Sequence, residues 1–443
     1  MSNPAANLFA TADLPMVAYG KGNYVYDTSG KQYIDGSGSP AIFSVGHGNE
    51  EVNAAIKAQL DQIAHGYRYN FLSEPLVELT KLIGEQCGGG LRQMMFVSSG
   101  SEAVESCLKI AMQYHYANGE PTRKRFIARK RSWHGNTLGA LSVSEFAQRK
   151  APFVGGLIKA SFVSAANSYR PPGGVAPNEL ADFCANELET EILRLGPENV
   201  CAFIFEPLVG AAGGVVPAPP SYAQRMAEVC RRYGVLVISD EVMCGSGRTG
   251  TWRALEYDGV EPDLMSVAKG LAGGYIPLGA TIYQNYIHDK IMENNGQLLT
   301  GHTFSAHTTA CAAGLAVQQL IQRENLLAQV AANGAWLQEQ LSEALGEHPH
   351  VGDIRGRGFF VGVEYVRDRE EKRPFDSSLQ LFLRLRSQAL ENGLICYPTG
   401  GNVDGEQGDV VILAPAYNAT RAELSEIVQK LAKSTHEVFA SLG

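Results

Sequence analysis

Short apolar runs recur along the chain and alternate with stretches in which apolar positions return every three or four residues. The runs that predict buried strands are 93–97, 126–128, 201–205, 235–239, 264–268 and 278–283. Helical periodicity covers 50–63, 74–86, 101–116 and 221–233. Because helices separate several of the strands, the pattern predicts an α/β fold with a mostly parallel sheet covered by helices on both faces. Functional side chains are then expected at the carboxyl ends of the strands.

The pattern changes towards both ends of the chain. Residues 1–48 predict short strands and turns, and a long helical pattern over 308–345 has a break near Glu324-Asn325. The segments after this helix predict strands at 359–364, 394–397 and 410–413, and helices at 377–392 and from 420 to the end. We therefore expect an N-terminal segment (1–50) that joins a small domain, a large domain (51–325), and a C-terminal small α+β domain (326–443).

Composition narrows the class of protein. The chain has 443 residues, 45% hydrophobic and 19% charged, which predicts a globular protein of two or three domains. A net charge of −9 without a dense basic stripe argues against a nucleic-acid partner. The eight cysteines form no C-x-x-C pair, and no signal peptide or long apolar span is present, so we expect a cytoplasmic protein without a membrane segment. The histidines show no metal-ligand spacing, and no metal site is expected.

Two of the predicted strands end on groups of specific chemical use. The run 235–239 leads to Asp240, and the run 264–268 leads to Lys269 and Gly270. Pyridoxal phosphate (PLP) requires a lysine amine for its aldehyde and a carboxylate for its ring nitrogen. Taken singly, such a lysine is more often a solvated strand end, and such an aspartate a cap or loop residue. The rest of the chain decides between these alternatives.

A serine- and glycine-rich turn, Ser98-Ser99-Gly100-Ser101, joins a predicted strand to a predicted helix. The amino end of a helix presents unpaired N–H groups and a positive dipole end, so this turn can hold a phosphate. The alternative is an ordinary helix cap, with Ser98 or Ser99 as the N-cap residue and Glu102 in the first turn.

Three further segments carry candidate ligands for such a cofactor. Trp133 follows the strand 126–128 and could stack on a flat ring, although a core tryptophan is the alternative. Glu206 follows the strand 201–205 and is either a placed carboxylate or part of a loop salt bridge. Gly301–Ser305 offers hydroxyls before the long helix, and a capping segment is the alternative.

One glycine pattern suggests a different cofactor. Gly245-Ser-Gly247-Arg-Thr-Gly250 matches the G-x-G-x-x-G pattern of dinucleotide-binding proteins. That fingerprint requires a helix that opens at the glycines, and no long helical pattern follows Gly250. A nicotinamide dehydrogenase is therefore the weaker interpretation.

Together these segments resemble the class III (ω-amino acid/amine type) PLP-dependent aminotransferases of fold type I. The matching segments, in the order of that family, are Ser99–Ala103, Trp133-His-Gly135, Glu206-Pro207, Asp240-Glu-Val242, Gly247–Gly250, Lys269-Gly270 and Gly301-His-Thr303. Asp27–Asp35 and Gly46-His47 also resemble the family's amino-terminal segment. The resemblance covers nearly the whole chain.

The resemblance implies a role for each matching residue. Lys269 would bind PLP as an aldimine and then act as general acid and base, while Asp240 would pair with the ring N–H. Ser99, Gly100 and Ser101 would hold the phosphate. Trp133 and Val242 would flank the ring, and Glu206 would lie near the ring or the substrate entrance. Thr303 would reach the phosphate of the neighbouring subunit, which implies a homodimer with shared active sites.

The chain departs from the family at one position. Many members carry a carboxylate-binding arginine in the strand after Gly393-Leu-Ile, where this chain has Tyr397. Tyr397, Phe43 and Arg68 are therefore our candidate substrate residues. Arg170, Arg355 and Arg357 are other arginines that could bind a carboxylate, but a structural role is expected for them.

We expect transamination between a primary amine or ω-amino acid and a 2-oxo acid such as pyruvate, through a pyridoxamine phosphate form of the cofactor. The main alternative is a PLP-dependent epimerase, racemase or lyase, which would use the same lysine and aspartate. A nicotinamide dehydrogenase and a non-catalytic binding protein are further alternatives, and the intact lysine, aspartate and phosphate loop argue against the second.

Overall fold

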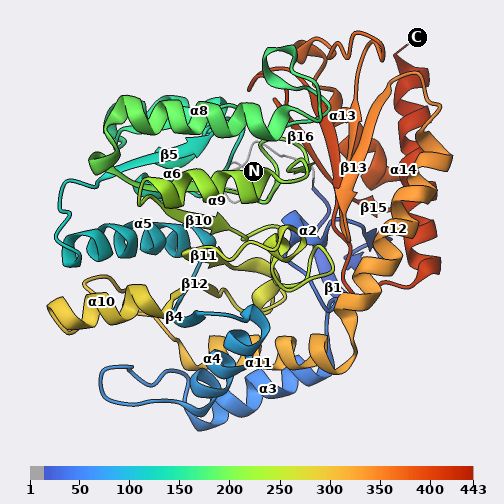
Figure 1. Ribbon diagram of the computed structural model, residues 1–443. Helices are drawn as coiled ribbons and strands as arrows, with labels where there is room; N and C mark the ends of the chain where they lie inside the picture. Colours follow the sequence, from blue (N-terminus) through green and yellow to red (C-terminus); the bar gives the residue numbers. More distant parts are fainter. Residues whose placement is uncertain (1–13, 443) are drawn as a thin grey trace.

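A seven-stranded sheet with strand order β4-β12-β11-β10-β7-β5-β6 forms the centre of the molecule (Figure 1). The structure is a computed structural model that describes residues 14–442. The strands are β4 (Leu91–Val97), β5 (Arg125–Arg129), β6 (Ala160–Val163), β7 (Val200–Phe205), β10 (Leu236–Asp240), β11 (Leu264–Val267) and β12 (Gly279–Gln284). Only β12 among them runs antiparallel to its neighbours, β11 and β4. The prediction of a mostly parallel sheet is confirmed.

Helices cover both faces of this sheet. On one face α8 (Leu180–Leu195) and α9 (Tyr222–Arg232) pack against β5, β6, β7 and β10. The opposite face is covered by α5 (Gly100–Ala117), α6 (Leu138–Val143) and α10 (Asn285–Asn295). Alternation along β7 explains the two layers, because Phe203 and Phe205 point into the first and Ala202 and Ile204 into the second. The helices α4 (Glu74–Cys87) and α11 (Thr308–Arg323) pack against β4, β11 and β12.

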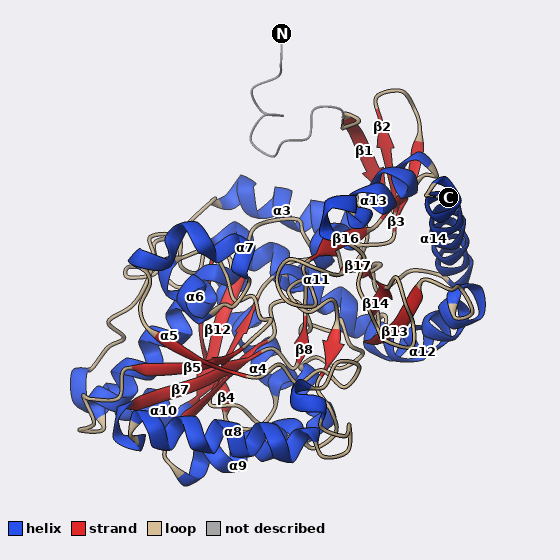
Figure 2. Ribbon diagram, turned by 90° about the horizontal axis from the view of Figure 1, so that it is seen from above, coloured by secondary structure: helices blue, strands red, loops and turns tan. Residues whose placement is uncertain are grey.

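A second, four-stranded sheet lies beside the central one and is covered by the last helices (Figure 2). Its strand order is β13-β14-β17-β16, and every pair is antiparallel. The elements are β13 (Val351–Arg357), β14 (Phe360–Tyr365), β16 (Tyr397–Gly400), β17 (Asp409–Leu413), α12 (Leu326–Leu345), α13 (Leu381–Glu391) and α14 (Arg421–Ser441). The predicted helix break is confirmed, since Asn325 separates α11 from α12 with φ +52°.

The N-terminal strands join a strand from the C-terminal region. The strands β1 (Val17–Lys21), β2 (Tyr24–Asp27) and β3 (Gln32–Asp35) form a sheet with β15 (Leu394–Ile395), which pairs parallel with β3. The helix α3 (Glu50–Gln62) follows, and the Asn49 side chain caps it by accepting from the N–H groups of Glu51 and Val52. The remaining short elements are α2 (Gly38–Ala41), α7 (Ala147–Lys150), β8 (Leu208–Val209) and β9 (Val216–Pro217). The domain boundaries at 50 and 325 stay predictions.

Two predicted elements differ from the structure. The strand expected at 394–397 is two strands in different sheets, β15 and β16, with Cys396 between them. The helix expected from 377 begins at Leu381, after a separate 3₁₀ turn at Ser377–Leu379. No helix among residues 14–442 has the length and apolar character needed to cross a membrane.

Candidate active site

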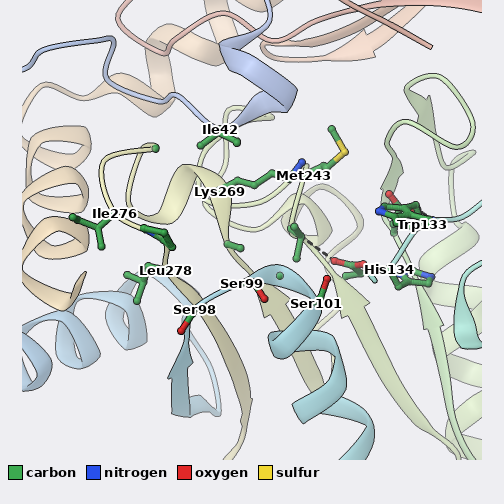
Figure 3. A pocket seen from close by; sticks show the side chains of 18 residues that line it. Ile42, Ser98, Ser99, Ser101, Trp133, His134, Met243, Lys269, Ile276 and Leu278 are labelled. Carbon is green, nitrogen blue, oxygen red and sulfur yellow. Dashed lines mark hydrogen bonds and ion pairs between the residues drawn. The ribbon is translucent and has the colours of Figure 1, made fainter. Parts of the chain in front are cut away.

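A cavity of about 370 Å³ lies at the carboxyl ends of β10 and β11 (Figure 3). Residues from segments far apart in the sequence line it. Those predicted from the sequence are Ser99, Gly100, Ser101, Trp133, Glu206, Asp240, Val242 and Lys269. The structure therefore brings together every predicted cofactor residue except Thr303.

Lys269 follows the end of β11 after one intervening residue and extends into the cavity (Figure 3). Its backbone has φ +50°, an unfavourable conformation for a residue with a side chain, which the surrounding structure must enforce. Its Nζ donates to the carbonyl oxygen of Pro40 at 2.8 Å. Burial lowers the pKa of the Lys269 amine to about 8, against the opposing effect of the carboxylates of Asp240 and Glu206. About a tenth of this amine is therefore unprotonated at neutral pH, far more than for a solvated lysine.

Asp240 ends β10 and is held by three donors. Its Oδ2 lies 2.6 Å from His134 Nδ1, and its Oδ1 accepts from Ser266 Oγ at 2.9 Å and from the Val242 N–H at 3.1 Å. Because a carboxylate oxygen accepts, His134 donates to Asp240 through Nδ1 in this contact. The other ring nitrogen, Nε2, is buried without a partner among residues 14–442. His134 thus fixes the position of the Asp240 carboxylate, and Asp240 still lines the cavity.

The turn before α5 combines a helix cap with a possible anion site. Ser99 is the N-cap residue, and its Oγ accepts from the Glu102 N–H at 3.2 Å, while Glu102 Oε2 accepts from the Ser98 N–H at 2.7 Å. The helix-cap alternative is therefore correct, but it does not exclude phosphate binding. The N–H groups of Gly100 and Ser101 belong to the first turn, where no helical carbonyl can pair with them.

Glu206 is a placed carboxylate and not part of a loop salt bridge. Its Oε1 accepts from the Trp133 N–H at 3.0 Å, and its Oε2 from the Gly210 N–H at 2.8 Å. Burial raises the pKa of Glu206, and the nearby Asp240 adds to this effect. Trp133 is half-buried, and its ring meets that of Phe146 edge-to-face with centroids 6.0 Å apart. Trp133 is therefore a wall of the cavity and not a core residue.

Four predicted residues lie outside the lining of this cavity. Thr303 and Arg68 line a separate hollow of the surface. The Phe43 ring contacts that of His47 in a tilted arrangement with centroids 4.0 Å apart, and it lies against Gly274, which does line the cavity. Tyr397 begins β16 and packs against the same buried apolar cluster as Met243, which does line the cavity.

The other arginines considered for a carboxylate are held by the protein itself. Arg355 pairs with Glu364 at 2.6 Å and donates to the carbonyls of Gly213, Gly214 and Val215. Arg170 pairs with the same glutamate at 2.7 Å. Arg357 lies over the Tyr257 ring, 4.1 Å from its centroid. The expected structural role of these side chains agrees with these contacts.

The glycine pattern at 245–250 does not open a helix. Arg248 within it is fully buried and donates to the carbonyl oxygens of Phe43 at 3.0 Å and of Phe359 at 3.2 Å, and also to that of Pro415. The segment therefore ties the N-terminal region to the second sheet, and the dinucleotide interpretation fails.

Sequence reasoning missed several residues of the cavity. The motif Trp133-His-Gly135 contains His134, but the contact of His134 with Asp240 joins residues 106 positions apart. The apolar wall residues Ile42, Met243, Ile276, Pro277 and Leu278 carry no sequence signal that separates them from core residues. The position of His134, beside Trp133 at the end of a strand, was the one usable clue.

Comparisons with known proteins agree with this geometry. The sequence profile of the family described as Aminotransferase class-III matches residues 10–434. This chain is a class III aminotransferase. The aminotransferase YodT of Bacillus subtilis is 37% identical over 428 residues, covering 97% of this chain and 96% of YodT. An aminotransferase of Schizosaccharomyces pombe is 39% identical, covering 97% and 94%.

The fold is also that of solved transaminases. The ω-transaminase from Pseudomonas jessenii in complex with PMP superimposes with a TM-score of 0.92 at 31% identity, covering 98% of this aminotransferase and 95% of that chain. The fold is thus that of the fold type I PLP transaminases, and the aminotransferase depends on PLP. The cavity fits this cofactor, because it combines a buried amine of lowered pKa, a fixed carboxylate and the unpaired N–H groups of α5.

Proposed function

We propose that this aminotransferase moves an amino group from a primary amine or ω-amino acid to a 2-oxo acid, with pyruvate as the first acceptor to test. The observation that carries the proposal is the shared cavity of Lys269 and Asp240, in which burial lowers the pKa of the amine to about 8 while His134 holds the carboxylate. The likeness to ω-transaminase structures supports an amine or ω-amino acid as donor.

Each cavity residue has a proposed task. PLP, when bound, draws electrons from the carbon that carries the amino group. Asp240 stabilises a proton on the ring nitrogen, and His134 keeps its carboxylate in place. Lys269 binds the aldehyde and later carries a proton between the substrate carbon and the cofactor. Ser99, Gly100 and Ser101 hold the phosphate at the start of α5. Trp133 and Val242 flank the ring, and Glu206 fixes Trp133 by accepting a hydrogen bond from the Trp133 N–H.

A homodimer with shared sites is part of the proposal. Thr303 is exposed and lies outside the cavity of its own chain, so it is free to reach the phosphate site of a second copy. Large apolar side chains are exposed around this residue and along the segment before α4, namely Tyr67, Tyr69, Phe71, Leu72, Leu299 and Phe304. Apolar side chains gathered in this way are typical of a surface covered by another subunit.

We also propose a reducing, cytoplasmic location. Seven of the eight cysteines are buried and Cys396 is half-buried, and all eight are free thiols. Unpaired buried thiols are typical of proteins from a reducing compartment.

The test is the absorption spectrum of the purified holoenzyme during single half-reactions. Each amine of a panel is added without an acceptor. We expect one of them to bleach the visible band of the bound cofactor, and pyruvate or 2-oxoglutarate to restore it. An unchanged band across the panel, with racemisation or elimination of a substrate, would instead support the epimerase or lyase alternative.

A further inference from the structure

The segment 145–150 carries Arg149, a cation that lies on the cavity residue Trp133 and is not neutralised by a carboxylate among residues 14–442. Arg131 pairs with Glu145 at 2.7 Å, and Lys150 donates to the carbonyls of Ser142 at 3.0 Å and Ser144 at 2.7 Å. No carboxylate of residues 14–442 pairs with Arg149, which is exposed at the end of α7.

The position of the Arg149 guanidinium is set by two aromatic rings. Its central carbon lies 4.8 Å from the ring centroid of Trp133 and 4.8 Å from that of Phe146. These two rings meet edge-to-face, so together they form a shelf for the guanidinium. Trp133 itself lines the cavity that contains Lys269. Arg149 is not itself a lining residue, but the shelf holds its charged fork of N–H donors against this wall residue with little further ordering needed.

The charge of Arg149 is also felt inside the cavity. It contributes to lowering the pKa of Lys269, together with burial and Arg248. Of these two arginines, Arg248 is fully buried and donates to carbonyl oxygens on three segments, which leaves it little capacity for a ligand. Within the described part of the chain, Arg149 donates to no carbonyl oxygen of this kind and is available to a ligand.

Among residues 14–442, the other arginines considered for an organic carboxylate are held by the protein or lie outside this cavity. This chain has Tyr397 at the strand position where many class III enzymes carry an arginine. Arg170 and Arg355 are both held by Glu364. A 2-oxo acid nevertheless has a carboxylate next to the carbon that receives the amino group. A guanidinium binds such a group through two parallel N–H···O bonds.

We propose that Arg149 is the specificity-determining residue that binds the carboxylate of the substrate, both of the 2-oxo acid acceptor and of donors that carry one. The inference rests on the proposed transamination and adds the residue that recognises the acid. Acceptors without a carboxylate, such as simple aldehydes, then enter the same cavity without using Arg149.

The test compares pyruvate with propanal as acceptors for wild type, Arg149→Gln and Arg149→Lys. We expect Arg149→Gln to raise the KM for pyruvate by about 10- to 100-fold, because a pair of hydrogen bonds to a charged group is lost. The KM for propanal should stay within about twofold of the wild-type value. Arg149→Lys keeps the charge but loses the two parallel bonds, and we expect an intermediate KM. Lys159→Gln, which removes an exposed charge before β6, is the matched control and should behave as wild type.

A binding measurement on the holoenzyme separates recognition from catalysis. Propanoate has the carboxylate but no oxo group to react, so we expect calorimetric titration to show binding to wild type and at least about tenfold weaker binding to Arg149→Gln. The cofactor spectrum should be the same in both proteins. An equal change of KM for pyruvate and propanal, or an altered cofactor spectrum, would mean that Arg149 only supports Trp133 and would overturn the inference. A wild-type protein that shows no transamination with any donor and acceptor would instead contradict the proposed function.

Discussion

At the scale of single residues, the strain and burial of Lys269 have a measurable consequence. The residue combines a φ of +50° with a half-buried side chain whose amine extends into the cavity, and only the unprotonated amine can attack an aldehyde. Because the pKa is lowered from 10.5 to about 8, the reactive fraction at neutral pH is about a tenth, far more than for a solvated lysine.

We therefore expect the apoprotein to take up PLP at a rate that rises with pH and reaches half its maximum near pH 8. Absorption followed after mixing, at a series of pH values, measures this rate. Borohydride reduction should then attach the cofactor to the peptide that contains Lys269, and Lys269→Arg should show no attachment. A midpoint near 10.5 would show that the folded protein does not perturb the amine.

The contact between His134 and Asp240 predicts a second effect at this scale. His134→Leu removes a buried donor to a carboxylate and leaves Asp240 with two partners. We expect kcat to fall by about 10- to 100-fold, the worth of one hydrogen bond to a charged group. His288→Leu changes a half-buried histidine outside the cavity and should leave kcat unchanged. Equal kcat values for the two variants would remove His134 from the positioning of Asp240.

At the scale of elements, the amino end of α5 depends on a close approach to Val242. A Cβ added at Gly100 would lie 2.8 Å from Val242 Cγ1, which is closer than van der Waals contact allows. The glycine therefore lets the first turn of α5 and the segment after β10 enclose the same cavity.

We expect Gly100→Ala to weaken PLP binding by about tenfold or more, since overpacking of this kind costs about 1–3 kcal/mol. Val242→Ala in the same chain should restore part of the affinity by removing the two methyl groups. Gly155→Ala is the control, because its added Cβ would have nothing within 4 Å. Affinity is measured by titrating apoprotein with PLP, and a Gly100→Ala protein with wild-type affinity would contradict the argument.

The elements found from the sequence share one property. Apolar runs such as 201–205 are buried on both faces and lie between clear helices, so the local hydrophobic pattern was enough to predict these strands. The direction of β12 depends on its pairing with β4, some 180 positions earlier, and no local signal carries it. The strand β13 was not predicted, because Gly352, Asp353 and Arg355 interrupt the alternation of apolar and polar positions along it. In the same way the order of strands along the chain was enough to predict that Lys269 and Asp240 lie close together, and they share one cavity. The contacts of His134 and Arg149 arise only from tertiary packing.

At the scale of the whole molecule, the exposed apolar side chains around Thr303 predict the assembly. Phe304→Asp and Leu72→Asp place charges on this surface, where the side chains are 58% and 78% exposed in the single chain. We expect both variants to sediment as monomers and to bind PLP more weakly than wild type, because Thr303 of a second copy no longer reaches the phosphate. Leu193→Asp, on α8, is the control and should remain dimeric. A wild-type protein that sediments as a monomer would refute the shared site.

The parallel pairing of β3 with β15 has a consequence for the biosynthesis of the chain. The Gln32–Asp35 strand leaves the ribosome some 360 residues before its partner Leu394–Ile395. At about 5–20 residues per second this interval lasts about 20–70 s. During this time the backbone groups on the edge of β3 that will pair with β15 have no strand partner, and a nascent chain arrested before residue 394 cannot complete the sheet. Ribosome-bound intermediates of this length are therefore expected to be substrates for chaperones that protect unpaired strands.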